Sequence, residues 1–180
     1  MDFIQSVDNA VVDFMLGLQN QFLTGFFTFF TVISEKGILW IAIAILLLIN
    51  KKTRKIGAVY SLSLAIGFSL SELLIKDLVM RERPFIANGD IKLLISAPSG
   101  YSFPSSHSAS SFASAVSLFL CDRRMGRSAL VVAFLIALSR VYFTVHYLTD
   151  VLGGITLGTV SAILIYLIIK KATSREKAEA

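Results

Sequence analysis

Apolar residues occur along this chain in blocks that short polar segments separate. The blocks extend over residues 22–34, 38–50, 56–79, 105–120, 128–143 and 146–169. A membrane-spanning helix needs ~20 largely apolar residues, so the two shortest blocks, at 22–34 and 38–50, must borrow from their flanks. The pattern predicts an all-α, polytopic membrane protein with six transmembrane helices.

Residues 2–18 have a different pattern. Apolar side chains recur there at helical spacing around Asp2, Asp8 and Asp13. This is typical of an amphipathic helix that lies at the membrane interface, because the segment is too polar to cross. At the other end, residues 171–180 are predicted to be a solvated tail. No internal repeat or second domain is evident, so residues 1–180 are predicted to form a single membrane domain.

The composition supports a membrane protein. Hydrophobic residues make up 55% of the chain and charged residues 16%, against about 25% charged in a soluble domain. A net charge of +5 is also found in nucleic-acid-binding proteins. The basic residues, however, sit in short clusters between apolar runs, so we expect membrane lipids and no nucleic acid as partners. One cysteine, Cys121, cannot form an internal disulfide.

The basic clusters predict an orientation in the cell membrane. They lie at 51–55, 121–127 and in the tail, after the second, fourth and sixth predicted helices. Six crossings place all three on one side, which the positive-inside rule makes cytoplasmic. Both termini are then cytoplasmic, and the long loop at 80–104 and the turn near His146 face outward. That face also holds Arg81, Arg83 and Lys92, cations that we expect to serve a ligand.

Polar residues of complementary kinds fall on this outer face. Lys76, Arg83 and Arg140 supply positive charge, and arginine matches phosphate oxygens with paired N–H groups. Pro104 is suited to begin a helix, and the N–H groups of the residues that follow it, Ser105, Ser106 and His107, would point out of the helix end. Such an end binds anions.

The two histidines, His107 and His146, complete the set. If the chain is helical at His146, Asp150 lies four residues further on the same face and can hold one imidazole nitrogen while the other stays basic. Such a histidine can attack phosphorus, and His107 can protonate a leaving oxygen. No cluster of carboxylates, or of Cys and His, has metal-ligand spacing, so we expect phosphoryl transfer without a metal or other cofactor.

In these polar segments the chain resembles the type 2 phosphatidic acid phosphatase superfamily, which shares its site with vanadium haloperoxidases. That family has three signatures: Lys with six residues before Arg-Pro, then Pro-Ser-Gly-His, then Ser-Arg with five residues before His and three more before Asp. The matching segments are Lys76–Pro84, Pro104–His107 and Ser139–Asp150. The first and third match in full. The second has Ser106 where the family usually has glycine, which adds a side chain beside the phosphate.

The resemblance implies a role for each motif residue between 76 and 150. His146 would be the nucleophile that forms a phosphohistidine, Asp150 would orient it and His107 would protonate the leaving group. The phosphate-binding residues would be Lys76, Arg83, Ser105, Ser106 and Arg140. It further implies an integral membrane lipid phosphatase acting on a phosphomonoester or diphosphate at the outer leaflet. The first expectation is undecaprenyl diphosphate hydrolysis to undecaprenyl phosphate; the alternative is phosphatidylglycerophosphate or phosphatidate.

Other functions remain as alternatives from the sequence. Buried charges also occur in transporters and channels, which would show paired broken helices in two halves of the chain, and no such symmetry is visible. A vanadate-binding haloperoxidase is a third class, but those relatives are usually soluble. Each histidine alone is also compatible with a packing role, and Glu72 with Lys76 at i, i+4 with a structural ion pair.

Overall fold

The structure is a computed structural model that describes residues 3–179, with side chains through residue 175. Within this part of the chain every regular element is helical, as predicted, and there are no strands. The elements are α1 (Phe3–Leu18), α2 (Gln21–Ser34), η1 (Glu35–Gly37), α3 (Ile38–Ile49), α4 (Arg54–Ser69), η2 (Leu70–Ile75), α5 (Lys76–Val79), α6 (Pro84–Ala87), α7 (Ser106–Cys121), α8 (Arg123–Tyr142) and α9 (Leu148–Glu179).

The first two predicted membrane helices form one crossing in the structure. Helices α2 and α3 have 14 and 12 residues, and at about 1.5 Å per residue neither reaches across the ~30 Å apolar layer alone. The η1 turn joins them, with Lys36 and Gly37 in the left-handed region at φ 51° and 71°. The stretch Gln21–Ile49 therefore replaces two predicted helices with one kinked helix.

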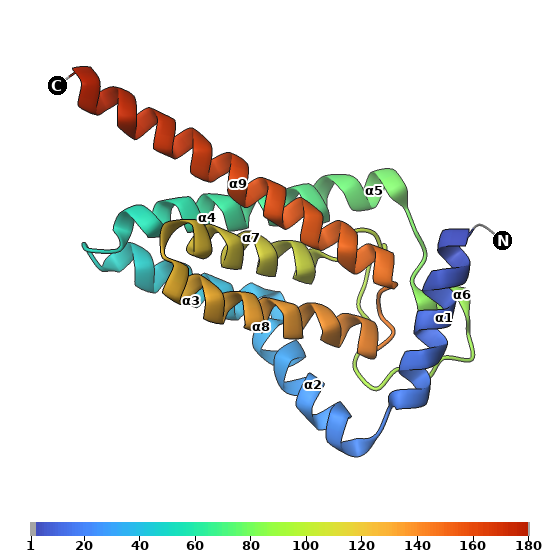
Figure 1. The fold of residues 1–180 in the computed structure, drawn as a ribbon. Coiled ribbons are helices and arrows are strands. Elements are labelled where there is room, and N and C mark those ends of the chain that lie inside the picture. The colour runs from blue at the N-terminus through green and yellow to red at the C-terminus, as the bar shows by residue number, and fades with distance from the viewer. Residues whose placement is uncertain (1–2, 180) are drawn as a thin grey trace.

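The count of six is not confirmed. Among the described residues, four stretches are long and apolar enough to cross a membrane: Gln21–Ile49, Arg54–Ala87, Arg123–Tyr142 and Leu148–Arg175. Helix α7 has 16 residues and lies inside the bundle, where it packs against α4, α8 and α9 (Figure 1). The predicted tail is also helical, since α9 continues to Glu179; residues 2 and 180 lie outside the described part.

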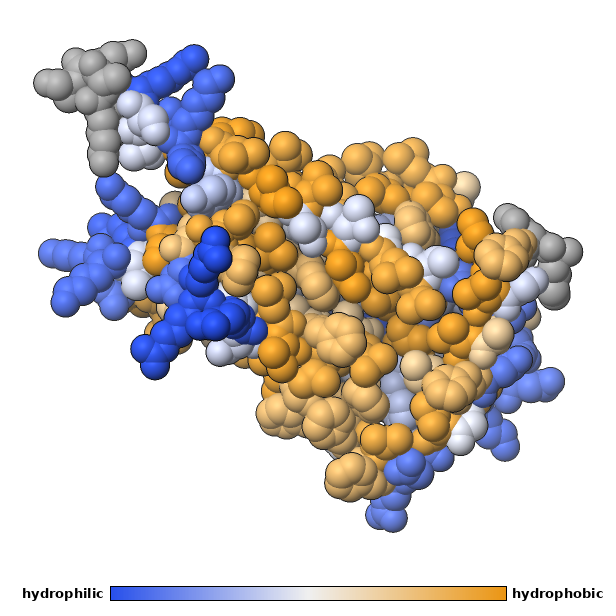
Figure 2. All heavy atoms as spheres, in the orientation of Figure 1, coloured by the Kyte–Doolittle hydropathy of each residue, from blue (hydrophilic) through white to orange (hydrophobic). Residues whose placement is uncertain are grey.

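Different segments of the chain lie at the two ends of the helix bundle. Helix α1 lies across one end, beside the 80–104 loop and the turn between α8 and α9 (Figure 1). The opposite end holds the α3–α4 turn, the α7–α8 turn and the last part of α9, so the three basic clusters share one end as predicted. Hydrophilic residues gather at both ends and an apolar belt lies between them (Figure 2).

The two ends of the described chain lie at opposite ends of the bundle (Figure 1), whereas the sequence pattern predicted both termini on one side of the membrane. Helix α1 contacts the loop end, where Asp8 forms an ion pair with Arg81 at 2.6 Å, whereas α9 leaves the bundle at the opposite end. The reason is the kinked helix: once α2 and α3 cross together, the number of crossings between the two ends of the chain changes by one.

Small residues bring α7 and α9 into close contact. Serine and alanine recur along α7, and the helix is buried along most of its length, from Ser106 to Leu118. On α9, a Cβ added to Gly154 or Gly158 would overlap backbone atoms of Ser105 or Ala109. Close backbone approach of this kind is how small residues hold membrane helices together. It fixes the start of α9 beside the start of α7.

Side-chain caps define where several helices begin. Asn20 accepts a hydrogen bond from the amide of Leu23 at the start of α2, and Asp122 accepts from two amides at the start of α8. Ser105 caps α7 in the same manner. These caps satisfy amides that have no partner within the helix.

Candidate active site

A cavity of about 750 Å³ lies beneath the loop end of the bundle. Six of the eight predicted site residues line it: Lys76, Arg83, Ser106, His107, Arg140 and His146. They come from α5, the segment before α6, the start of α7, the end of α8 and the α8–α9 turn. The three sequence motifs therefore converge on one space, and the two imidazoles share it. Ser105 and Asp150 lie behind its wall.

The cavity also has an apolar side and further charges. Trp40, Ile41, Leu64 and Phe68 contribute to its lining, together with Glu35 and Lys36 from the η1 turn. The cationic side chains Lys36, Lys76, Arg83 and Arg140 face the carboxylates Glu35 and Glu72. A site with excess positive charge beside an apolar wall suits an anion attached to an apolar group.

His146 lies in the turn between α8 and α9 and not in a helix, because α9 begins at Leu148. His146 therefore precedes the helix, where the sequence pattern predicted it inside one, although Oδ2 of Asp150 still lies 3.7 Å from Nδ1. Thr144, at φ 53°, turns the chain so that the imidazole enters the cavity. The side chain is 2% exposed.

The two imidazole nitrogens of His146 have different neighbours. Nε2 lies 3.2 Å from Nη1 of Arg83, and Nδ1 lies 3.5 Å from Oγ of Ser102 and 3.7 Å from Oδ2 of Asp150. Arginine has only donors, so Nε2 is the acceptor and the proton of the neutral ring sits on Nδ1. The lone pair of Nε2 consequently points toward Arg83, a second residue of the cavity lining.

Burial lowers the pKa of His146 to about 4, with Arg83 and Arg140 acting in the same direction and Asp150 opposing them. Taking a cation out of water is unfavourable, and two neighbouring guanidinium groups add repulsion. The imidazole is therefore neutral at pH 7, which is the form that can attack phosphorus.

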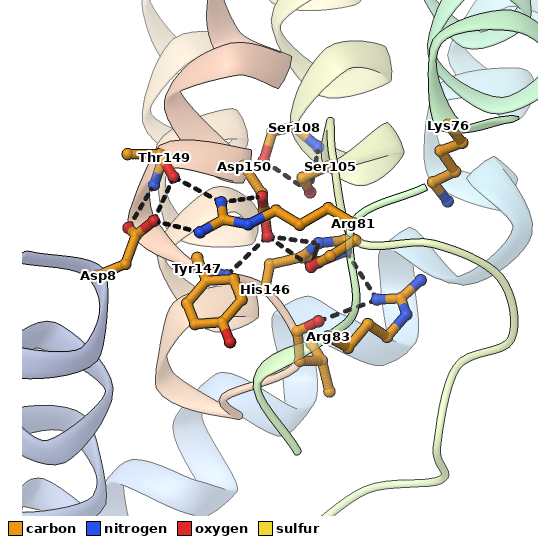
Figure 3. Close-up of polar contacts among 12 residues, drawn as sticks. Asp8, Lys76, Arg81, Arg83, Ser105, Ser108, His146, Tyr147, Thr149 and Asp150 are labelled. Carbon is orange, nitrogen blue, oxygen red and sulfur yellow. Dashed lines mark hydrogen bonds and ion pairs between the residues drawn. The ribbon is translucent and has the colours of Figure 1, made fainter. Parts of the chain in front are cut away.

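Asp150 is fully buried in the first turn of α9. Its Oδ2 accepts hydrogen bonds from the amide of Tyr147 at 2.8 Å and from Oγ of Ser102, and its Oδ1 accepts from Nη1 of Arg81 at 2.7 Å (Figure 3). The bond to Tyr147 is the reverse half of a capping box, which ties the His146 turn to the helix. Asp150 thus holds the imidazole partly through Ser102.

Arg83 is 2% exposed and rigidly held. Its guanidinium donates to the carbonyl oxygens of Ser99, Gly100 and Val145 at 2.9 to 3.0 Å. These bonds and the contact with His146 leave an N–H of Nη2 for a ligand. The 97–102 segment is therefore fastened to the site through Arg83.

Two predicted phosphate ligands share a carboxylate. Lys76 donates to Oε2 of Glu72 at 2.6 Å, and Oγ of Ser106 donates to the same oxygen. Glu72 belongs to η2, a π-helical segment that α4 passes into, and such segments occur often at functional sites. Glu72 therefore belongs to the site as well as forming the predicted ion pair.

Ser105 does not serve as predicted. Its amide donates to the main-chain oxygen of Asp150 at 3.0 Å and its hydroxyl accepts from Ser108, so neither group faces the cavity. The bond joins the starts of α7 and α9. Ser106 and His107 remain at the cavity wall, where the open end of α7 begins.

Arg140 is 3% exposed, and its Nε has no hydrogen-bond partner among the described residues. A buried, unpaired guanidinium N–H is unfavourable unless a ligand satisfies it. Its place in the cavity lining makes an anionic ligand the natural partner. No group of three or more His, Cys, Asp or Glu side chains with metal-site geometry occurs among the described residues; metal independence stays a prediction.

The sequence did not single out Ser102, and it assigned Arg81 to a ligand. In the structure Arg81 binds Asp150 and Asp8 instead, at 2.7 and 2.6 Å. The position of Arg81, two residues before Arg83, suggested that it belongs to the site. The sequence could not indicate its partners, because Asp8 and Asp150 are far from it along the chain. Lys92 does not line the cavity.

Comparisons with known proteins agree with the family resemblance of the three motif segments. The model of the PAP2 superfamily matches residues 55–174. An undecaprenyl-diphosphatase of Sulfolobus acidocaldarius is 38% identical over 121 residues, which are 67% of this chain and 58% of that protein. A lipid A 4'-phosphatase of Bacteroides thetaiotaomicron is 26% identical over an alignment of 189 positions, covering 97% of this chain and 82% of that protein.

Two solved structures share the fold. A transmembrane PAP2 type phosphatidylglycerolphosphate phosphatase from Bacillus subtilis superposes with a TM-score of 0.75 at 27% identity, over 95% of this chain and 88% of that one. Aquifex aeolicus LpxE superposes with the same TM-score of 0.75 at 24% identity, over 92% of this chain and 96% of that one. At this identity, the likeness to Aquifex aeolicus LpxE shows a shared fold only.

Proposed function

Because this chain belongs to the PAP2 superfamily, we propose that it is a multi-pass membrane lipid phosphatase that uses His146 as its nucleophile. The observation that carries the proposal is the convergence of six motif residues on one cavity that also has an apolar wall. The phosphate group would lie among the cations and the lipid chain against the apolar wall.

The reaction proceeds in two steps. Nε2 of His146 attacks phosphorus while the bond between phosphorus and the leaving oxygen breaks, and His107, in its protonated form, gives that oxygen a proton and becomes neutral. Water then attacks the phosphohistidine, His107 takes a proton from it, and inorganic phosphate leaves with Nε2 restored. Arg83, Arg140 and Lys76 stabilise the charge on the transferred phosphoryl oxygens.

Our first choice of substrate is undecaprenyl diphosphate, converted to undecaprenyl phosphate. The relative from Sulfolobus acidocaldarius and further similar proteins carry the name undecaprenyl-diphosphatase. Phosphatidylglycerophosphate is the alternative, because a structural neighbour acts on it, and phosphatidate is the other phosphomonoester to compare. The head-group end of the cavity, with Ser106 where the family usually has glycine, is where these substrates would differ in fit.

Purified protein in detergent micelles should be given the three lipids in parallel, with phosphate release as the readout. We expect the highest kcat/KM for undecaprenyl diphosphate. A preference for phosphatidylglycerophosphate would replace the substrate but keep the reaction. No release from any of the three by folded protein would overturn the proposed function.

We also propose that turnover needs no metal. The four cations lining the cavity can supply the charge that a metal supplies in other phosphoryl-transfer enzymes. Dialysis against EDTA should leave kcat within about twofold of its starting value, a ratio far below the several orders of magnitude that a catalytic metal supplies. Loss of activity that Mg²⁺ or Zn²⁺ restores would contradict this.

The active site is proposed to face the outer leaflet. The basic clusters lie at the end of the bundle opposite the cavity, and such clusters stay in the cytoplasm. Cys121, the chain's single cysteine, is the last residue of α7 and so precedes the α7–α8 turn at the cluster end. In right-side-out vesicles a membrane-impermeant maleimide should leave Cys121 unlabelled and should label Asn88→Cys in a Cys121→Ser background. The reverse pattern would invert the orientation.

A further inference from the structure

Helix α1 carries a fully buried acid on its inner face. Asp8 is 0% exposed, whereas the apolar side chains Phe3 and Phe14 on other faces of the same helix are more than half exposed. Burying a carboxylate is unfavourable unless it is paired and hydrogen-bonded. Asp8 is both, so the face of α1 that meets the bundle has a specific polar partner.

That partner is the start of α9 together with Arg81. Oδ1 of Asp8 accepts from the amide of Thr149 at 3.0 Å, and Oδ2 accepts from the Thr149 hydroxyl and from Nη2 of Arg81 at 2.6 Å (Figure 3). Gln5, one turn earlier on α1, accepts from the same Nη2 at 3.1 Å. Two residues of α1 thus fix one side of the guanidinium.

The other side of the guanidinium reaches the catalytic machinery. Nη1 of Arg81 donates to Oδ1 of Asp150 and to the hydroxyl of Thr149, both at 2.7 Å. The guanidinium also stacks on the ring of Tyr147 at 4.0 Å, and the main-chain oxygen of Arg81 accepts from the amide of Ser102 at 2.8 Å. Arg81 therefore contacts four residues around the His146 turn: Ser102, Tyr147, Thr149 and Asp150.

In this arrangement the two oxygens of the Asp150 carboxylate have different partners. Oδ1 is occupied by Arg81, so Oδ2 is the oxygen that faces Ser102 and Nδ1 of His146. Without Arg81 the carboxylate could rotate and offer either oxygen to the imidazole. Without Asp8 the guanidinium would lose the anchor that sets its plane, because a planar group with paired donors depends on both partners for orientation.

Resting on the proposed function, we propose that Asp8 and Arg81 are positioning residues of the active site. They fix Asp150, which in turn directs Nε2 of His146 into the cavity. Helix α1, which lies outside residues 55–174 matched by the family model, is then a working part of the catalytic centre as well as a surface that rests on lipid.

The test compares Asp8→Asn and Arg81→Met with Asp13→Asn, a matched control because Asp13 is an exposed acid on the same helix. Misplacing a catalytic group by about 1 Å costs on the order of 10²-fold in rate. We expect kcat to fall on the order of 10²-fold in Arg81→Met and about 10-fold in Asp8→Asn. KM should stay within about twofold, since neither side chain reaches the phosphate subsite, and Asp13→Asn should match the wild type.

The pH profile separates positioning from a general loss of structure. In the wild type, kcat/KM should fall as the pH drops through about 4, where His146 becomes protonated. The charged or titratable groups that act on His146 directly are Asp150, Arg83, Arg140 and His107. Lys76 and Glu72 line the same cavity, and Arg81 contacts Asp150 behind it. Removing the positive charge of Arg81 should move this limb to higher pH, and removing the negative charge of Asp8 should move it to lower pH.

Three results would overturn the proposal: Asp8→Asn with wild-type kcat, variants whose pH limbs do not move in opposite directions, or a loss that appears only as raised KM. If Arg81→Met does not fold, Arg81→Lys, which keeps the charge but not the paired donors, should fold and show the kcat loss. Failure of the wild type on every lipid would instead count against the proposed function.

Discussion

Replacing His146 with alanine should abolish turnover on every lipid phosphate substrate. The reason is the shape of the site, in which Nε2 of His146 is the lone pair held toward the phosphoryl position by Arg83 on one side and by Asp150 with Ser102 on the other. Removing the nucleophile from a group of catalytic residues that act together lowers kcat on the order of 10⁴-fold or more. Phosphate release by purified variant and wild type provides the measurement.

The control for this variant is ligand binding. Lys76, Arg83 and Arg140 remain in His146→Ala, so vanadate should still raise its melting temperature, as a ligand that binds only the folded state does. His107→Ala gives a second comparison. It should be impaired on lipids yet recover with p-nitrophenyl phosphate, whose leaving group needs no proton. If His146→Ala kept a tenth of wild-type turnover while folded, the nucleophile assignment would be wrong.

Replacing Gly158 with alanine should cause a large loss of stability, although it adds only one methyl group. The added Cβ would overlap the carbonyl oxygen of Ala109 and lie 2.8 Å from the amide nitrogen of Ala113, both backbone atoms of α7. Backbone cannot rotate away as a side chain can, so the helices must separate. Overpacking of this kind destabilises by about 1–3 kcal/mol, and we expect the upper end.

Gly25→Ala is the matched control, since a Cβ on Gly25 has no atom within 4 Å. The two substitutions add the same atom in helices, so the difference in melting temperature in one detergent reports the α7–α9 contact. Gly25→Ala should be neutral or stabilised by up to about 1 kcal/mol through helix propensity. Equal melting temperatures would show that α7 and α9 do not approach as closely as described.

Gly158→Ala should also reduce activity. The same helix contact holds the main-chain bond from the Ser105 amide to Asp150, which aligns the start of α7 with the start of α9. The cavity-lining Ser106 and His107 lie on one of these helices and Asp150 on the other. The site therefore depends on a glycine that lies outside all three motifs.

Residue chemistry and the resemblance of three segments to family signatures singled out Lys76, Arg83, Arg140 and both histidines, and all five line the cavity. Helical spacing did not predict the local geometry around His146. The relation of His146 to Asp150 was expected from helical periodicity, yet Thr144 and its left-handed backbone put the histidine in a turn. A turn of this kind has no periodic signature.

The partners of charged side chains were the least predictable. Arg81 looked like a ligand-binding cation, but Asp8, 73 residues away, and Asp150 occupy it. Ser102 likewise meets Asp150 across 48 residues. Contacts over such separations depend on how helices pack, and the residue types themselves are ordinary surface types. Ser105 is a similar case, since its capping role and its bond to α9 are properties of the bundle.

The sequence by itself determined that the chain is helical and membrane-spanning, because a long apolar block must satisfy its own backbone in lipid. It also singled out six residues that line one cavity. Tertiary structure alone decided that α2 and α3 cross as one kinked helix, that α1 docks at the loop end, and that Arg81 and Ser102 serve Asp150. The physical reason is the same in each case: hydrophobicity and spacing act along the chain, whereas the partner of a buried charge is set by which helix ends meet.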